Sequence, residues 1–176
     1  MAAADIRIGL IGAGGNVGDR HIPGFQKVEG VETIAVANRS LGSSRSLADQ
    51  FNFPRVFGSW QELLDDEEIN AVCIGTWPFM HRTLTLAALE KGKHVLTEAR
   101  MANTAQEARD MLEASRGNSH LVCERELLDG KPVNIGQGSP IFRDMMELVE
   151  TPSAMVEHSI QHHFQVSQMG RVQQLT

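Results

Sequence analysis

The sequence predicts an α/β fold in which a doubly wound parallel sheet of about six strands is followed by a short, mostly helical tail. Two observations predict it. Short apolar runs alternate with segments of helical periodicity as far as residue 124, and the turns between them are short. Such alternation requires crossover connections of one hand, which place helices on both faces of a parallel sheet.

Six apolar runs are the expected strands. The first, "IRIGLI" at 6–11, is continuous and is followed by glycine, which is typical of a strand buried on both faces. The remaining five runs are 33–37, 55–57, 71–76, 94–98 and 120–124.

Helices are expected between these strands because apolar residues recur there at helical spacing. The first follows the initial strand directly, and others are expected near 43–51 and 79–91 and from 104 onward. The apolar stripe of this first helix consists of Val17, His21, Phe25 and Val28.

Two capping boxes mark helix starts. In "SWQE" and "TAQE", Ser59 is followed by Glu62 and Thr104 by Glu107. In such a box the hydroxyl and the carboxylate satisfy each other's backbone N–H groups. Gly92 is the expected end of the helix at 79–91.

Composition sets the broad class of protein. The chain has 176 residues, 41% of them hydrophobic and 22% charged, as in an ordinary soluble globular protein. There is no signal-peptide pattern, and no apolar run reaches the ~20 residues of a membrane helix. Cys73 and Cys123 are isolated in apolar runs, which favours buried, reduced thiols and a cytoplasmic location. A net charge of −6 without a basic block argues against nucleic acid as a partner.

The turn after the first strand is rich in glycine. A dinucleotide site needs a tight turn and then a bare backbone that lets a pyrophosphate reach the amides where a helix begins. The pattern stands in that context, after a buried strand and before a helix, which favours dinucleotide binding in a Rossmann-type fold over a merely structural turn. The residues concerned are Gly12, Ala13, Gly14, Gly15, Asn16, Val17 and Gly18.

The end of the second strand bears on which dinucleotide is bound. An Asp or Glu about 20 residues after the glycine turn holds the adenosine ribose in NAD-binding proteins. Here the residues are Asn38, Arg39 and Ser40, with Arg45 nearby. A neutral side chain followed by a guanidinium and a hydroxyl favours the 2′-phosphate of NADP over NAD, whereas the alternative is a solvated loop arginine.

The motifs together are specific. The segments "GDRHIPGF", "FGSWQELLDDEEINAVCIGT", "AALEKGKHV" and "MLEASR" occur in an order and spacing that resemble the N-terminal half of the Gfo/Idh/MocA oxidoreductases, from residue 5 to about 122. The resemblance implies an NAD(P)-binding Rossmann domain over residues 1–124. It also implies hydride transfer between the cofactor and a hydroxyl or carbonyl carbon of a sugar-like substrate.

The same resemblance implies roles for residues after the fourth and fifth strands. Thr76, Trp77 and Pro78 match the loop that lines the nicotinamide half of the cofactor, and Glu98 matches a glutamate near the nicotinamide ribose. It implies that His81 and Arg100 face the substrate. The alternatives are that Pro78 begins a helix, Trp77 is packing and His81 is a core histidine.

The sequence departs from the family pattern in two places. Ala99 stands where the family has a proton-handling lysine, and Arg100 replaces the expected proline. Arginine stays protonated and can bind a carboxylate or phosphate but cannot replace the lysine. Losing one acid–base group typically costs about 10²–10⁴ in rate, so hydride transfer is expected to survive but to be slow. The alternative function is a nucleotide-binding module without turnover.

The second departure is the tail, residues 125–176, which stands in place of a larger substrate and dimerisation domain. Helices are expected at 141–150 and 154–169. His158, His162 and His163 lie close together there, but no third ligand accompanies the i, i+4 pair, so no metal site is predicted. The expected partners are thus the dinucleotide and a sugar-like small molecule, with the oligomeric state left open.

Overall fold

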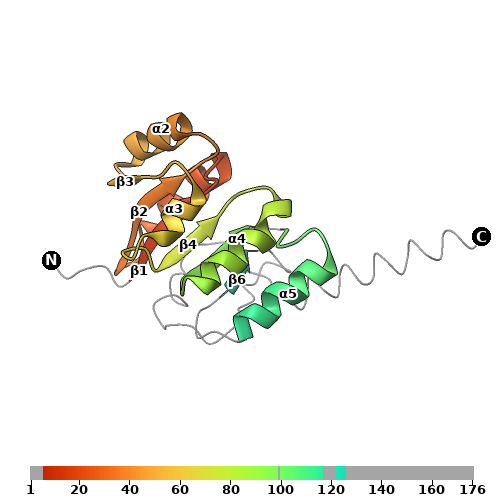
Figure 1. Ribbon diagram of the computed structural model, residues 1–176. Helices are drawn as coiled ribbons and strands as arrows, with labels where there is room; N and C mark the ends of the chain where they lie inside the picture. The colour runs from red at the N-terminus through yellow and green to blue at the C-terminus, as the bar shows by residue number, and fades with distance from the viewer. Residues whose placement is uncertain (1–5, 99, 117–121, 126–176) are drawn as a thin grey trace, which may run out of the picture.

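The computed structural model describes residues 6–98, 100–116 and 122–125, which form a six-stranded parallel sheet with helices on both faces (Figure 1). All five strand pairings are parallel and the strand order is β3-β2-β1-β4-β5-β6. The predicted fold class is therefore confirmed. The strands are β1 (Ile6–Ile11), β2 (Val31–Ala37), β3 (Arg55–Val56), β4 (Ala71–Ile74), β5 (His94–Glu98) and β6 (Val122–Arg125).

The strand order locates the binding edge of the sheet. The chain moves from β1 outward to β2 and β3, then crosses back to β4 on the other side of β1 and continues to β5 and β6. In open α/β sheets, ligands bind outside the carboxyl ends of the strands at the point where the order reverses. That point lies between β1 and β4.

The helices form two layers. One apolar cluster joins β1 to residues of the first helical segment and α2, and a second cluster on the opposite face includes residues of α3, α4 and α5. In Figure 1, α4 and α5 lie side by side, and Arg82 Nε donates to Asp110 Oδ2 between them at 2.7 Å. The helical elements are η1 (Val17–His21), α1 (Ile22–Phe25), α2 (Leu41–Phe51), α3 (Trp60–Asp65), α4 (Pro78–Glu90) and α5 (Ala105–Arg116).

Strand β1 is buried on both faces, as its continuous apolar run predicts. Ile8 and Leu10 belong to one apolar cluster and Ile11 to the other. Gly9 faces the second layer, because a Cβ there would lie 2.8 Å from Leu63 Cδ2 of α3. This glycine therefore lets α3 pack closely against the central strand.

The boundaries differ from expectation at a few points. Strand β2 begins two residues early, at Val31, because Val31 and Glu32 pair with the start of β1 although Glu32 breaks the apolar run. Strand β4 ends at Ile74, and Gly75 and Thr76 lead into the next loop. The first helix begins as a π-helical turn, η1, a feature frequent at functional sites.

Both capping boxes form, with one correction. Ser59 Oγ accepts from the Glu62 N–H at 3.2 Å, but the Glu62 carboxylate accepts from Gly58 N–H, one residue before the cap. The second box shows the same shift, because the Glu107 carboxylate accepts from the residue before Thr104. The expected reciprocal bond to the cap residue itself was wrong, since the chain entering each helix brings the preceding amide within reach.

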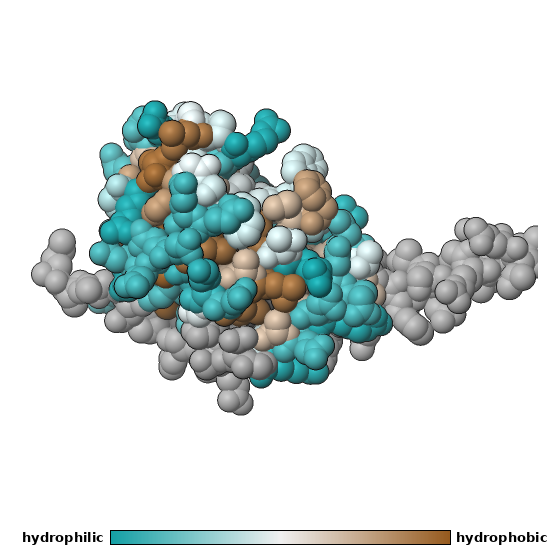
Figure 2. Space-filling model, in the orientation of Figure 1, coloured by the Kyte–Doolittle hydropathy of each residue, from teal (hydrophilic) through white to brown (hydrophobic). Residues whose placement is uncertain are grey.

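The described residues bear on the polarity of the surface and on the expected lack of a membrane helix. Figure 2 shows a face that is mostly hydrophilic, with hydrophobic atoms in small patches between hydrophilic ones. No helix in the described part is long and apolar enough to cross a membrane. Cys73 is buried in β4 as predicted, whereas the expectations for 141–150, 154–169 and the three tail histidines lie outside the described residues.

Candidate functional site

The glycine turn begins with a residue that must be glycine. Gly12 has a φ of +73°, which L side chains rarely adopt, and its N–H donates to Ala37 O at 3.0 Å. A Cβ at Gly12 would also lie 2.4 Å from Thr76 Cγ2. The turn is therefore pressed against the segment that follows β4.

A second close approach occurs one residue earlier in that segment. A Cβ at Gly75 would lie 2.4 Å from Val17 Cγ2 and 3.1 Å from Gly12 O. The first helical turn thus crosses directly over the end of β4. The sequence analysis did not single out Gly75, although a glycine immediately after a buried strand was an available signal.

The middle of the turn presents bare backbone. Gly14, Gly15 and Asn16 are exposed, and a Cβ at Gly14 would meet no atom of the described residues within 4 Å. Space of this kind fits a pyrophosphate that must approach the main chain closely. Val17 and Ala13 behave differently, because their side chains are buried in the core and do not line this surface.

The end of β2 is tied to the glycine turn by Asn38. Its Nδ2 donates to Ala13 O at 3.2 Å and to Ser43 Oγ at 3.1 Å. Within the described part of the chain, its Oδ1 is buried without a hydrogen-bond partner. A buried acceptor beside the turn fits a ligand hydroxyl, whereas an aspartate here could not donate to the Ala13 carbonyl.

The two residues after Asn38 lie at the surface. Arg39 and Ser40 are exposed, and Ser40 is the N-cap of α2, where its Oγ accepts from the Ser43 N–H at 3.2 Å. The guanidinium and the start of an eleven-residue helix therefore share one edge of the site. Both favour a negatively charged group.

The loop after β4 exposes two aromatic side chains. Trp77 is 75% exposed and Phe79 is 62% exposed. The alternative that Trp77 packs in the core is therefore wrong, as far as its contacts with the described residues show. Pro78 does begin a helix, at the first position of α4, so its fixed φ has a structural purpose there.

His81 is not where a substrate-facing residue would be. Its side chain is fully buried, with Nε2 2.9 Å from Thr76 O and Nδ1 3.2 Å from Met101 O. The prediction that it faces a substrate is corrected, because helix α4 turns it into the core. His81 instead links the loop after β4 to the loop after β5.

Glu98 ends β5 and is contacted by two residues of the first helical segment. His21 Nε2 lies 2.8 Å from Glu98 Oε1, and Asn16 Nδ2 donates to the same oxygen. His21 is fully buried and the Glu98 side chain is 17% exposed. The sequence analysis placed His21 only in an apolar stripe, so this partner of Glu98 was missed.

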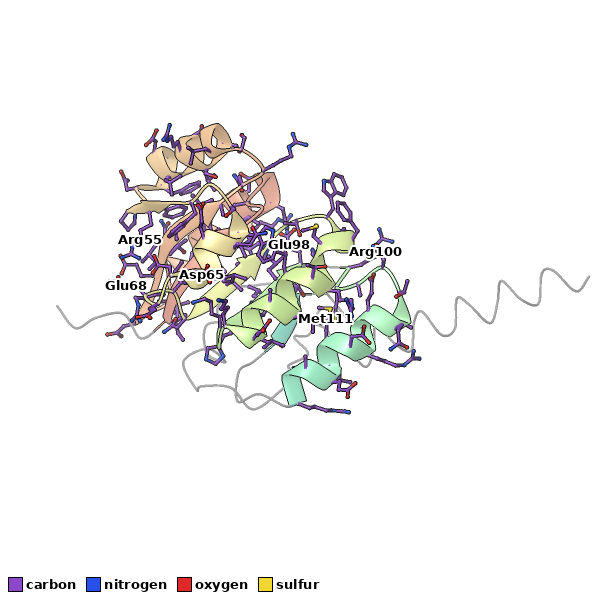
Figure 3. The ribbon with its side chains drawn as sticks, viewed as in Figure 1. Arg55, Asp65, Glu68, Glu98, Arg100 and Met111 are labelled. Carbon is purple, nitrogen blue, oxygen red and sulfur yellow. The ribbon has the colours of Figure 1, made fainter. Side chains whose placement is uncertain are left out.

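Arg100 lies on the outer side of the site. Its side chain is exposed, and Figure 3 shows it pointing outward, away from Glu98. Met101, one residue on, is buried completely. Residues 98–101 thus begin with the Glu98 carboxylate at the end of β5, include the exposed Arg100 and end with a residue buried in the core.

The structure therefore brings most of the predicted residues to one edge of the sheet, at the β1/β4 switch point. Groups of three or more His, Cys, Asp or Glu side chains suited to a metal ion do not occur among the described residues. The arrangement offers exposed backbone, a buried acceptor, an arginine and a held carboxylate at the carboxyl ends of the strands, which suits an extended, negatively charged nucleotide.

Comparison with known proteins agrees with this geometry. The family of oxidoreductases described as Gfo/Idh/MocA, with an NAD-binding Rossmann fold, matches residues 6–125. An uncharacterised oxidoreductase of Rhizobium meliloti is 32% identical over 127 residues, which is 72% of this chain and 38% of the relative. The 1,5-anhydro-D-fructose reductase of Ensifer adhaerens is 34% identical over 62% of this chain and 33% of its own length.

Solved structures show the same fold. KijD10, a 3-ketoreductase of Actinomadura kijaniata in complex with TDP-benzene and NADP, matches with a TM-score of 0.64 and 26% identity over 68% of this chain and 38% of its own. A biliverdin reductase of Synechocystis, in complex with biliverdin and NADP+, matches with a TM-score of 0.63 and 28% identity over 68% of this chain and 37% of its own. This chain spans less than half the length of these relatives. With a family match over residues 6–125, it belongs to the Gfo/Idh/MocA oxidoreductases and carries their NAD-binding Rossmann fold.

Proposed function

We propose that this chain binds a nicotinamide dinucleotide and serves an oxidoreductase that transfers hydride to or from a sugar-like substrate. The observation that carries the proposal is the bare backbone at Gly14, open at the β1/β4 switch point of the sheet. The nicotinamide, when bound, supplies the hydride chemistry. The protein supplies binding, orientation and charge.

Different residues of the site would contact different parts of the dinucleotide. Backbone from Gly12 to Gly18 would hold the pyrophosphate, because its exposed part lies where the first helix begins. Asn38 Oδ1 would accept from an adenosine ribose hydroxyl. Trp77 and Glu98 would frame the nicotinamide end, with Thr76 and Pro78 flanking Trp77 in the loop after β4. These roles are the ones that the family resemblance implies, assigned to residues at their positions in the structure.

NADP is the preferred cofactor in this proposal. Arg39 is exposed beside the N-terminus of α2, and both favour a 2′-phosphate. Asn38 adds no negative charge that would repel one. The KijD10 and Synechocystis structures contain NADP, which supports this preference by likeness.

A nucleotide-binding module without turnover is the second candidate, favoured by one observation. Ala99 occupies the position of the lysine that the family pattern implies for proton handling. Alanine cannot carry a proton, and Arg100 can bind a substrate carboxylate but not act as an acid–base group. In this candidate, residues 1–124 would bind the nucleotide without catalysing a reaction.

Fluorescence of Trp77 tests binding. We would titrate a Trp60→Phe variant, in which Trp77 is the remaining tryptophan, with NADPH and NADH. Binding should quench its emission, more tightly for NADPH, and a Trp77→Phe variant that keeps Trp60 should show a much smaller change. Absence of quenching and of a thermal shift with either cofactor would reject both candidate functions.

Turnover separates the two candidates once binding is seen. Consumption of NADPH would be followed at high protein concentration against a panel of keto-sugars, and NADP+ reduction against the corresponding sugars. Oxidoreductase activity predicts slow but substrate-dependent turnover, whereas a binding module predicts none. A Glu98→Gln variant should bind NADPH more weakly in either case.

A further inference from the structure

The buried histidine of the first helical segment has a contact that packing alone does not explain. His21 is fully buried and its ring stacks on Phe25 with centroids 6.0 Å apart. Val17 and Ile22 in the same segment fill comparable core positions with purely apolar side chains. An imidazole in their company requires polar contacts, because an unsatisfied buried polar group is costly.

The contact joins parts of the sheet that are not neighbours. His21 follows β1, whereas Glu98 ends β5, and β4 lies between those two strands. His21 Nε2 reaches Glu98 Oε1 at 2.8 Å because the first helical turn crosses over Gly75 at the end of β4. The bond therefore fixes the carboxylate relative to the glycine turn and not only to its own strand.

Two side chains, one in the core and one at the surface, contact the same oxygen of the carboxylate. Asn16, in the exposed part of the glycine turn, donates to the same Glu98 Oε1 that His21 contacts from the core. These two contacts restrict the rotamers of the Glu98 side chain and so fix the direction in which its carboxylate points. Hydrogen bonds to a charged group are strong enough to change an equilibrium by about tenfold or more.

We infer that His21 is a positioning residue that holds the Glu98 carboxylate in place for the nicotinamide half of a bound dinucleotide. It does so from beneath the glycine turn, so binding at the nicotinamide end of the nucleotide depends on one buried contact. This inference rests on the proposed function. His21 acts through Glu98 and does not touch the cofactor.

The test compares variants of the full chain that differ in one hydrogen bond. His21→Gln keeps an N–H donor near the position of Nε2, whereas His21→Leu and His21→Phe remove it, and the phenylalanine keeps a ring against Phe25. Each variant is titrated with NADPH and with 2′,5′-ADP, which carries only the adenosine side of the cofactor. Melting curves confirm that each variant is folded.

The inference predicts a split between the two ligands. His21→Leu and His21→Phe should weaken NADPH binding about tenfold and leave 2′,5′-ADP within about twofold, and His21→Gln should recover most of the loss. In a Glu98→Ala background, His21→Leu should add no further loss for NADPH. Equal weakening of both ligands, additive losses, or no loss at all would overturn the positioning role.

A spectroscopic measurement serves if the His21 variants do not fold. The ¹⁵N chemical shifts of the His21 ring report whether Nε2 carries the proton. They should differ between the unmodified chain and the Glu98→Ala variant, both of which keep His21. Unchanged shifts would overturn the inference. If the unmodified chain binds neither NADPH nor 2′,5′-ADP, the proposed function fails and the inference fails with it. If the unmodified chain binds both ligands but the His21 variants weaken both equally or neither, the inference alone fails.

Discussion

Replacing Gly75 by alanine tests how closely the glycine turn approaches the sheet. An alanine Cβ would lie 2.4 Å from Val17 Cγ2, whereas ordinary contacts of this kind begin at 3.4 Å, so the shortfall is 3.4 − 2.4 = 1.0 Å. Val17 is β-branched and 1% exposed, so it cannot move aside by changing rotamer freely. The same Cβ would be 3.1 Å from Gly12 O, which blocks the other direction.

The expected cost is that of overpacking a rigid core, about 1–3 kcal/mol in the free energy of unfolding. For a chain of this size, each kcal/mol lowers the melting temperature by roughly 2–4 °C. Urea unfolding followed by circular dichroism would measure the change, with the midpoint falling and the m-value unchanged. Binding of NADPH should also weaken, because the strain displaces the turn that holds the pyrophosphate.

Gly14→Ala is the matched control, since it makes the same chemical change in the glycine turn that Gly75 contacts. No atom of the described residues lies within 4 Å of the added methyl group, so stability should stay within about 0.5 kcal/mol of the parent. NADPH binding should nevertheless fall sharply, because the methyl group occupies the space beside the bare backbone. If Gly75→Ala is as stable as Gly14→Ala, the close crossing over β4 is wrong.

Three further predictions address other parts of the structure. Asn38→Asp should lower the preference for NADPH over NADH in fluorescence titrations, because it adds a negative charge near the 2′-phosphate and faces the Ala13 carbonyl. Lys93→Met should cost about 1–3 kcal/mol in urea unfolding, because Lys93 is 4% exposed and its Nζ donates to Asp66 O at 2.9 Å and to Ile69 O at 2.6 Å. Burial lowers the pKa of Lys93, so the unfolded chain holds this proton to higher pH, and unfolding free energy should rise with pH just below 10.5 more steeply than in Lys93→Met. Ser59→Ala should cost about 1 kcal/mol by the same urea assay through loss of the α3 cap, without changing cofactor affinity.

The alternation of apolar runs and helical periodicity was enough to predict the sheet and its layers. The signal is strong because β1, β4 and β5 are buried on both faces, and the residues along such strands are mostly apolar. Predictions failed where a polar residue lies at a strand end, as Glu32 does in β2. They also could not foresee η1, because local spacing does not distinguish a π-helical turn from an α-helical one.

The candidate site was predictable where backbone chemistry defines it and not where side chains meet across the sheet. Gly12 and Gly14 follow from the geometry of a turn that sequence context makes visible. The pairing of His21 with Glu98 joins residues 77 positions apart, and nothing local to either residue signals it. His81 was misassigned for the same reason, since its partners are backbone carbonyls that a motif does not name.

The departure at Ala99 belongs to a stretch whose two ends are held by buried histidines. Glu98 is held by His21, and the carbonyl of Met101 lies 3.2 Å from His81 Nδ1. Neither contact involves the lysine position, so the loss of a lysine there leaves the anchoring of the cofactor-side carboxylate intact. We therefore predict that cofactor binding and proton handling are separable in this chain. Ala99→Lys should leave the dissociation constant for NADPH within about threefold. It should raise the turnover of a sugar substrate by about 10²-fold, which is the lower end of the range typical of one acid–base group. An equal gain in binding and turnover would show instead that the lysine position contributes to holding the nucleotide.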